Sequence, residues 1–102
     1  MSGHYILVGR EPVKYDDLEE WARWLEKANR IVARDKTPGV TVSTVFLGLD
    51  HRFRGDVGPP LLFETMIFGG PHDEYQERCS TWEEAEEQHA IAVRLARAGA
   101  EP

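Results

Sequence analysis

The chain has 102 residues, a length that fits one domain spanning residues 1–102. Hydrophobic residues make up 41% and charged residues 29%, which excludes a disordered or fibrous chain. The single cysteine, Cys79, cannot form an internal disulfide, so a reducing compartment is favoured over a secreted disulfide scaffold. No apolar run approaches the roughly 18–20 residues of a membrane span, and the N-terminus lacks the basic region of a signal peptide. We therefore expect a soluble, cytoplasmic protein.

The formal net charge is −6, and the charge is unevenly distributed. Residues 1–40 hold seven basic and seven acidic side chains, whereas residues 71–102 hold three arginines against eight acids. A surface of this sign repels phosphate backbones, which disfavours nucleic acid as a partner.

The first third of the chain predicts a strand and then a helix. Tyr5 to Val8 is a short apolar run that Gly9 ends, as expected for a strand. A helix is predicted over Tyr15 to Arg34, with Asp16 as its N-cap, and the turn formers at 37–39 stop it. Apolar residues recur at three- and four-residue steps along it: Leu18, Trp21, Leu25, Ala28 and Val32.

Two runs rich in β-branched and aromatic residues, Thr41–Leu49 and Leu61–Phe68, predict an antiparallel pair of central strands. Alternation places Val45, Leu47 and Leu49 opposite Val42, Thr44 and Phe46 in the first, and Leu61, Phe63, Thr65 and Ile67 opposite Leu62, Glu64, Met66 and Phe68 in the second. Both faces are largely apolar, and helices can cover one of them. A second subunit is the simplest cover for the other.

The last third predicts an edge strand over Tyr75–Cys79 and a second helix. Ser80 to Glu83 matches the S-x-x-E capping box that opens a helix. Its apolar stripe consists of Trp82, Ala85, His89, Ala92, Val93 and Ala96. The order strand, helix, strand, strand, strand, helix predicts an α+β fold, with an antiparallel sheet of three to four strands and two helices on one face.

Two polar features are candidate ligand sites. In the loop after the first central strand, Arg52 and Arg54, beside His51, could grip an anion through forked hydrogen bonds. The alternative is a solvated loop whose arginines pair with nearby aspartates, and this alternative is favoured. Glu64 could act as a general base if burial raises its pKa. The favoured alternative is that Glu64 sits on the half-exposed face or pairs with an arginine across an interface.

Other chemistry finds little support. The histidines and Cys79 lack metal-ligand spacing, so we expect no metal site and no cofactor, and His89 is interpreted as a hydrogen-bonded core residue. Cys79 lies beside a helix start, yet a buried inert thiol is the favoured interpretation. A basic stripe on the first helix, Arg23, Lys27, Arg30 and Arg34, could meet phosphates or an acidic partner, but a solvated face is favoured. Phosphate-loop, dinucleotide and nucleophile-elbow motifs are absent.

Several long strings resemble a group of uncharacterised small proteins encoded by tailed bacteriophages and prophages. They are W-A-R-W-L-E, V-S-T-V-F-L-G-L-D-H, P-L-L-F-E-T-M-I-F-G-G and S-T-W-E-E-A-E-E-Q-H-A, which together cover roughly residues 21–89. The resemblance implies a phage or prophage origin and the cytoplasm of the host bacterium. It implies no catalytic residue.

The function predicted from these features is protein–protein interaction without catalysis, as a homodimer formed through the sheet face and with an unknown host or phage protein as a further partner. The alternative is a small anionic-ligand binding or hydrolytic site built from the loop 50–54 and Glu64. A third possibility, nucleic-acid regulation through the basic stripe, conflicts with the acidic net charge.

Overall fold

The computed structural model describes residues 3–52 and 57–100 and contains a two-stranded and a four-stranded antiparallel sheet with two helices. The four-stranded sheet has the strand order β3-β4-β5-β6. The predicted α+β class is therefore confirmed. In chain order the elements are β1 (Tyr5–Val8), β2 (Glu11–Lys14), α1 (Leu18–Lys27), β3 (Ile31–Thr37), β4 (Val40–Phe46), β5 (Phe63–Phe68), β6 (Gln76–Cys79) and α2 (Trp82–Ala100).

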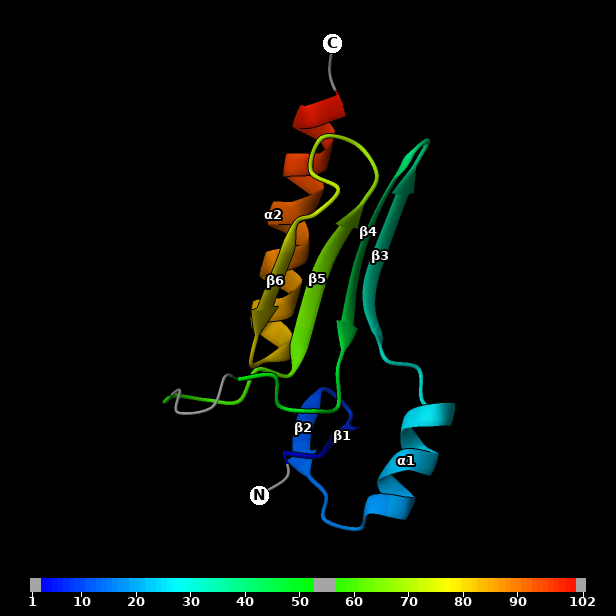
Figure 1. The fold of residues 1–102 in the computed structure, drawn as a ribbon, viewed down its shortest axis with the longest axis vertical. Helices are drawn as coiled ribbons and strands as arrows, with labels where there is room; N and C mark the ends of the chain where they lie inside the picture. Colours follow the sequence, from blue (N-terminus) through cyan, green and yellow to red (C-terminus); the bar gives the residue numbers. More distant parts are fainter. Residues whose placement is uncertain (1–2, 53–56, 101–102) are drawn as a thin grey trace.

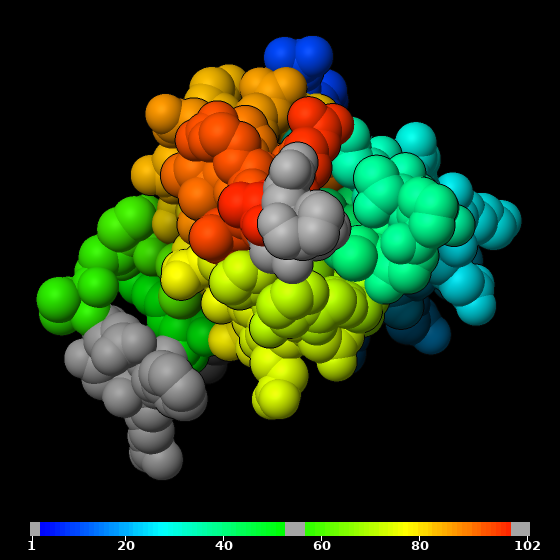
Figure 2. Space-filling view, turned by 90° about the horizontal axis from the view of Figure 1, so that it is seen from above, coloured from blue at the N-terminus to red at the C-terminus, as the bar shows by residue number. Residues whose placement is uncertain are grey.

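The long helix α2 packs against all four strands of the larger sheet, whereas α1 packs against β1. Figure 1 shows α2 running along the sheet, with the β1–β2 hairpin and α1 gathered at its lower end. At the upper end, Figure 2 shows α2 in orange to red beside the β3–β4 turn in teal and the β5–β6 loop in yellow-green. Within residues 3–52 and 57–100 no further helix exists to cover the second face of the sheet.

The core lies between α2 and the sheet, and strand alternation builds it. Phe46, Phe63 and Ile67 point toward α2 and are fully buried. Burying side chains of this size stabilises the fold by about 1.5–3 kcal/mol each. Ala85 and Ala92 present their small side chains to the sheet, which lets α2 approach closely. The predicted division of the two central strands into faces is confirmed at these positions.

The first helix is shorter than predicted, because it ends at Lys27 and not at Arg34. Ala28 is already extended, and the side chain of Asn29 accepts a hydrogen bond from the N–H of Ile31 at 3.1 Å. The following residues form β3, which pairs with β4. The β-branched pair Ile31-Val32 favours a strand, and pairing with β4 outweighs the helical spacing of the apolar residues.

The turn that was expected to stop the helix instead joins β3 to β4. Thr37 pairs with Val40, so Pro38 and Gly39 form a two-residue hairpin loop. Gly39 has a φ of 84°, a conformation that glycine adopts without the steric cost that other residues meet. The strand β2 was not predicted; its four residues include Pro12 and pair with β1.

The N-terminal hairpin and α1 are fixed to the lower end of the sheet by Trp21. Its indole N–H donates to the carbonyls of Tyr5 at 3.0 Å and Gly48 at 3.2 Å. The N–H of Tyr5 also donates to Gly48 at 2.8 Å. Trp24 packs edge-on against Phe46, with ring centroids 5.9 Å apart. The buried Trp21 thus joins three segments distant in sequence.

Candidate functional site

A chain of four polar side chains crosses the interface between α2 and the sheet. The hydroxyl oxygens of Thr44 and Thr65 lie 2.7 Å apart, and Thr44 Oγ1 lies 2.8 Å from His89 Nδ1. On its other side, His89 Nε2 lies 2.7 Å from Asp35 Oδ1. One arrangement of protons satisfies all these bonds: Nε2–H donates to Asp35, while Nδ1 accepts from Thr44, which accepts from Thr65.

A hydroxyl, an imidazole and a carboxylate in this order have the composition of a nucleophile–base–acid triad. Thr44 and Thr65 are both 0% exposed, however, so no substrate reaches either hydroxyl. The chain instead separates two apolar clusters of the core, one around Phe46 and Phe63 and the other around Val42 and Ile67. It fixes the position of α2 on the sheet, because any shift would leave buried polar groups without partners. His89 is therefore the hydrogen-bonded core residue that the sequence predicts.

The loop after β4 is organised by the carboxylate of Asp50. Asp50 Oδ1 accepts from the N–H groups of Arg52 and Leu61, both at 3.0 Å, and Oδ2 accepts from Arg52 Nε at 2.8 Å. Burial alone would raise the pKa of Asp50, but these hydrogen bonds and the Arg52 charge outweigh it and lower the pKa below its usual range. Asp50 therefore closes the two ends of the loop, and its pairing with Arg52 is the arrangement favoured in the sequence analysis.

The four candidate ligand residues lie as follows. Arg52 is held by Asp50 and also donates to the carbonyl of Gly58, and His51 Nδ1 lies 2.8 Å from the carbonyl of Leu49. Arg54 lies outside the described residues. Glu64 is on β5, where Arg78 Nε donates to its carboxylate at 2.9 Å and Gln76 donates as well. The three described members thus have partners of their own, and the anionic-ligand site stays a prediction.

The proposed basic stripe is divided by the structure, which corrects the sequence analysis. Arg23 and Lys27 are on α1, whereas Arg34 is on β3. Arg30, between them, donates from Nη1 to the carbonyl of Phe46 at 3.0 Å. The four residues do not share one helix face because the helix ends before the last two.

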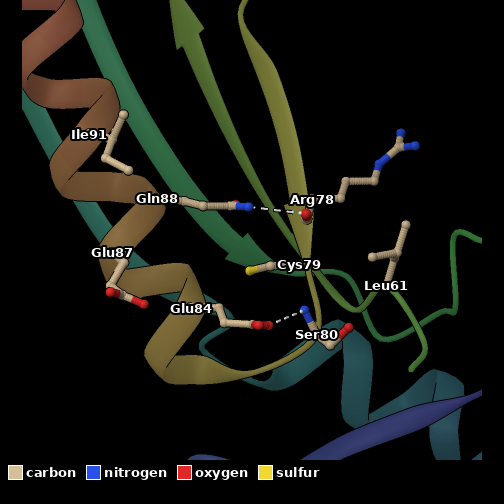
Figure 3. A pocket seen from close by; sticks show the side chains of 8 residues that line it. All are labelled: Leu61, Arg78, Cys79, Ser80, Glu84, Glu87, Gln88 and Ile91. Atoms are coloured by element: carbon tan, nitrogen blue, oxygen red, sulfur yellow. Dashed lines mark hydrogen bonds between the residues drawn. The ribbon is translucent and has the colours of Figure 1, made fainter. Parts of the chain in front are cut away.

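A groove of about 430 Å³ lies between the edge strand β6 and α2. Its walls are formed by Leu61, Arg78, Cys79, Ser80, Glu84, Glu87, Gln88 and Ile91 (Figure 3). In Figure 3 Gln88 reaches across from α2, and its Nε2 donates to the main-chain carbonyl of Arg78 at 3.1 Å. The Arg78 side chain points away from the groove, toward Glu64 on the other face of the sheet. The walls therefore contain two carboxylates without a facing basic side chain from the described part of the chain.

Cys79 lies in the wall of this groove as a buried thiol. Burial, followed by the charge of Glu84, raises its pKa to about 12. A thiol with this pKa is protonated at neutral pH and is a poor nucleophile. The predicted burial of Cys79 is confirmed, and the raised pKa agrees with the interpretation of an inert thiol that the start of α2 does not activate.

The second face of the sheet, which we call the open face, carries both apolar and polar side chains. Its apolar members are Ile31 on β3, Val45 on β4, and Met66 and Phe68 on β5, with Ile31 40% and Phe68 47% exposed. Thr41, Ser43 and Glu64 face the same side on the two central strands, where they pair with Phe68, Met66 and Val45, so this face is less apolar than predicted. The edge strands add further polar residues: Arg34 and Lys36 on β3, and Gln76 and Arg78 on β6. The predicted orientation of Val45, Glu64, Met66 and Phe68 toward this face is confirmed.

Comparisons with protein-family models, with curated protein sequences and with solved structures find no match to this chain. The resemblance to phage-encoded proteins therefore stays a prediction. Among residues 3–52 and 57–100, no three His, Cys, Asp or Glu side chains are placed to hold a metal ion together. In the same residues no helix has the length and apolar character needed to span a membrane.

Proposed function

We propose that the protein acts by binding other proteins and not by catalysis, and that it pairs with a second copy of itself through the open face. The single observation that carries this proposal is the pattern of that face, in which the apolar Val45, Met66 and Phe68 lie beside polar residues on the two central strands and charged residues lie on both edge strands. Interfaces that form reversibly combine apolar and polar side chains in this way.

The size of the open face sets the expected strength of the pairing. Four strands about 4.8 Å apart and about 20 Å long project roughly 400 Å². A standard interface buries about 800 Å² on each partner. The dimer is therefore expected to be weak and to depend on concentration. A tighter dimer would need additional contact area from the loops beside the sheet.

The chemistry of the described side chains supports a non-catalytic role. The only Thr–His–Asp chain in the described residues is sealed in the core at its hydroxyl end, and Cys79 is held as a neutral thiol. Glu64 is paired with Arg78 and Gln76, so its carboxylate is already engaged. Each of these groups is thus engaged within the fold.

Sedimentation velocity over a range of protein concentrations tests the pairing. Phe68→Lys replaces an exposed apolar side chain of the open face with a charge and is expected to weaken dimerisation roughly tenfold or more. Ile91→Lys is the matched control, because Ile91 is 44% exposed on α2 while Phe68 is 47% exposed on the open face. A wild-type protein that stays monomeric throughout, or a control that dissociates the dimer as strongly, would contradict the proposal.

A phage or prophage origin, with a host or phage protein as a further partner, belongs to the same proposal. The resemblance of residues 21–89 to phage-encoded proteins supports it. The genes beside the coding sequence test it: neighbouring phage genes are expected, and a location among bacterial housekeeping genes alone would contradict it.

A further inference from the structure

The strand β6 leaves one edge of the four-stranded sheet without a neighbouring strand. The N–H of Ile67 donates to Tyr75, and the two strands pair in an antiparallel register. Because main-chain groups alternate in direction along such a strand, those of Gln76 and Arg78 point away from β5. The carbonyl of Arg78 shows this directly, since it accepts from the Gln88 side chain of α2. This edge offers main-chain donors and acceptors on the side of the groove.

Gln88 covers this edge incompletely. Its Nε2 donates to Arg78, but its Oε1 is buried and has no partner among the described residues. A buried acceptor without a donor is costly. If Gln88 swings out of the groove, this oxygen becomes accessible to a donor and the carbonyl of Arg78 becomes available to a main-chain N–H. The side chain therefore acts as a weak cap that an incoming strand can replace.

The walls of the groove indicate which strand would fit. Glu84 and Glu87 project from α2, and in the described chain no basic side chain pairs with either. Glu84 Oε1 already accepts from the N–H groups of Ser80 at 3.1 Å and Thr81 at 3.2 Å, so Glu87 is the carboxylate more available to a ligand. Ile91 adds an exposed apolar surface, and Leu61 lies at the other wall. Alternate side chains of a strand point to the same face. A strand added at β6 would direct every second side chain toward α2, and a basic side chain there would meet the carboxylate of Glu87, with the charge of Glu84 nearby.

We propose that the groove between β6 and α2 binds an extended segment of a partner protein as a fifth strand, with lysine or arginine at alternate positions facing α2. Main-chain hydrogen bonds to Gln76 and Arg78 supply affinity, and the side chains facing α2 supply specificity, as in other cases of strand addition. The inference rests on the proposed role in protein binding, but it does not require the dimer. The groove lies on the α2 side of the sheet and the open face on the other side, and both border β6.

A random peptide library displayed on yeast and selected for binding to the purified full-length protein tests this inference. Enriched sequences are expected to carry lysine or arginine at every second position, and the synthetic peptides are expected to bind more weakly as salt rises. Absence of enrichment, or enrichment without this alternation, would overturn the proposal.

Variants then locate the bound peptide by fluorescence anisotropy. Gln76→Pro removes an outward N–H without breaking the ladder to β5 and is expected to weaken binding roughly tenfold or more. Lys36→Pro is the matched control on the other sheet edge and is expected to bind as the wild type does. Glu87→Lys reverses a charge in the groove lining and is expected to abolish binding. Glu86→Lys, the same charge change outside the groove lining, is expected to preserve binding.

Two further measurements separate the possible outcomes. Gln88→Ala is expected to bind the peptide at least as tightly as the wild type, because no cap has to be displaced, and a loss of affinity would overturn the strand-replacement mechanism. If Phe68→Lys binds the peptide, the proposed binding site in the groove is supported, whether or not the wild type forms a dimer. If the wild type forms a dimer but binds no selected peptide, the groove proposal is refuted and the dimer proposal is not affected.

Discussion

The Nε2 atom of His89 lies 2.7 Å from Oδ1 of Asp35, a contact that joins α2 to the edge strand β3. His89 is 8% exposed at its side chain, whereas the Asp35 side chain is 49% exposed. The two ends of this contact therefore contribute differently to stability. The buried end holds the Thr44 hydroxyl in the core, while water can replace much of the exposed end.

Replacing the two residues one at a time should separate these contributions. His89→Leu deprives the buried Thr44 of a partner and is expected to lower the free energy of unfolding by about 1–3 kcal/mol. Asp35→Asn is expected to lower it by less than about 1 kcal/mol, because the contact is exposed to solvent. Urea denaturation measures both. Equal losses in the two variants would show that the buried chain does not fix α2.

Gly69 and Gly9 form a matched pair for testing how closely the main chain at Gly69 approaches the β3–β4 turn at Gly39. Both have positive φ, 89° and 65° respectively. A Cβ added at Gly69 would lie 2.0 Å from the carbonyl oxygen of Gly39, whereas one at Gly9 would meet nothing within 4 Å. Gly9→Ala is expected to cost about 1 kcal/mol for its conformation alone. Gly69→Ala should lower the thermal midpoint substantially more, and similar midpoints would contradict the contact between the two turns.

Asp50 should make the loop between β4 and β5 sensitive to acid. Its pKa is lowered in the folded protein, so its contribution to stability is present above the unfolded pKa of about 3.9 and is lost as the pH falls through the folded value. The free-energy difference between wild type and Asp50→Asn should therefore be largest at neutral pH and shrink below about pH 4. Denaturation at several pH values measures it. A difference that grows in acid would contradict the direction of the shift.

Cys79 should resist alkylation as long as the protein is folded. With a pKa of about 12, little thiolate exists at pH values where an unfolded cysteine is half ionised. Iodoacetamide is expected to react at least about a hundredfold more slowly with the native protein than with the protein in urea. Mass spectrometry follows the reaction. Rapid labelling of the folded protein would show that the thiol is accessible and ionised.

The sequence predicted the sheet well where alternation and burial act together. Val42, Thr44 and Phe46 face α2 while Val45 faces away, as their two-residue period requires. Boundaries were less accurate, since the N-cap of each helix lies one residue later than predicted. The N-caps are Asp17, which bonds the N–H of Glu20 at 3.0 Å, and Thr81, which bonds the N–H of Glu84 at 3.1 Å. In both places adjacent residues had equally good capping side chains.

Other features could not be predicted because they depend on residues distant in sequence. Ile31 and Val32 fit a helix stripe as well as a strand, and pairing with β4 decides between them. Asp35 contacts His89 because it lies on β3. The prediction of a helix up to Arg34 therefore also prevented the prediction of the buried polar chain. The groove requires β6 and α2 to be placed side by side, and no local pattern specifies its width.

Recording ¹H–¹⁵N and methyl spectra of the wild type during dilution shows whether two copies meet through the open face. Pairing through this face requires concentration-dependent shifts at Val45, Met66 and Phe68, whereas Ala85 and Ala92 in the core should show none. Spectra that do not change with concentration, or changes confined to the outer surface of α2, would contradict it.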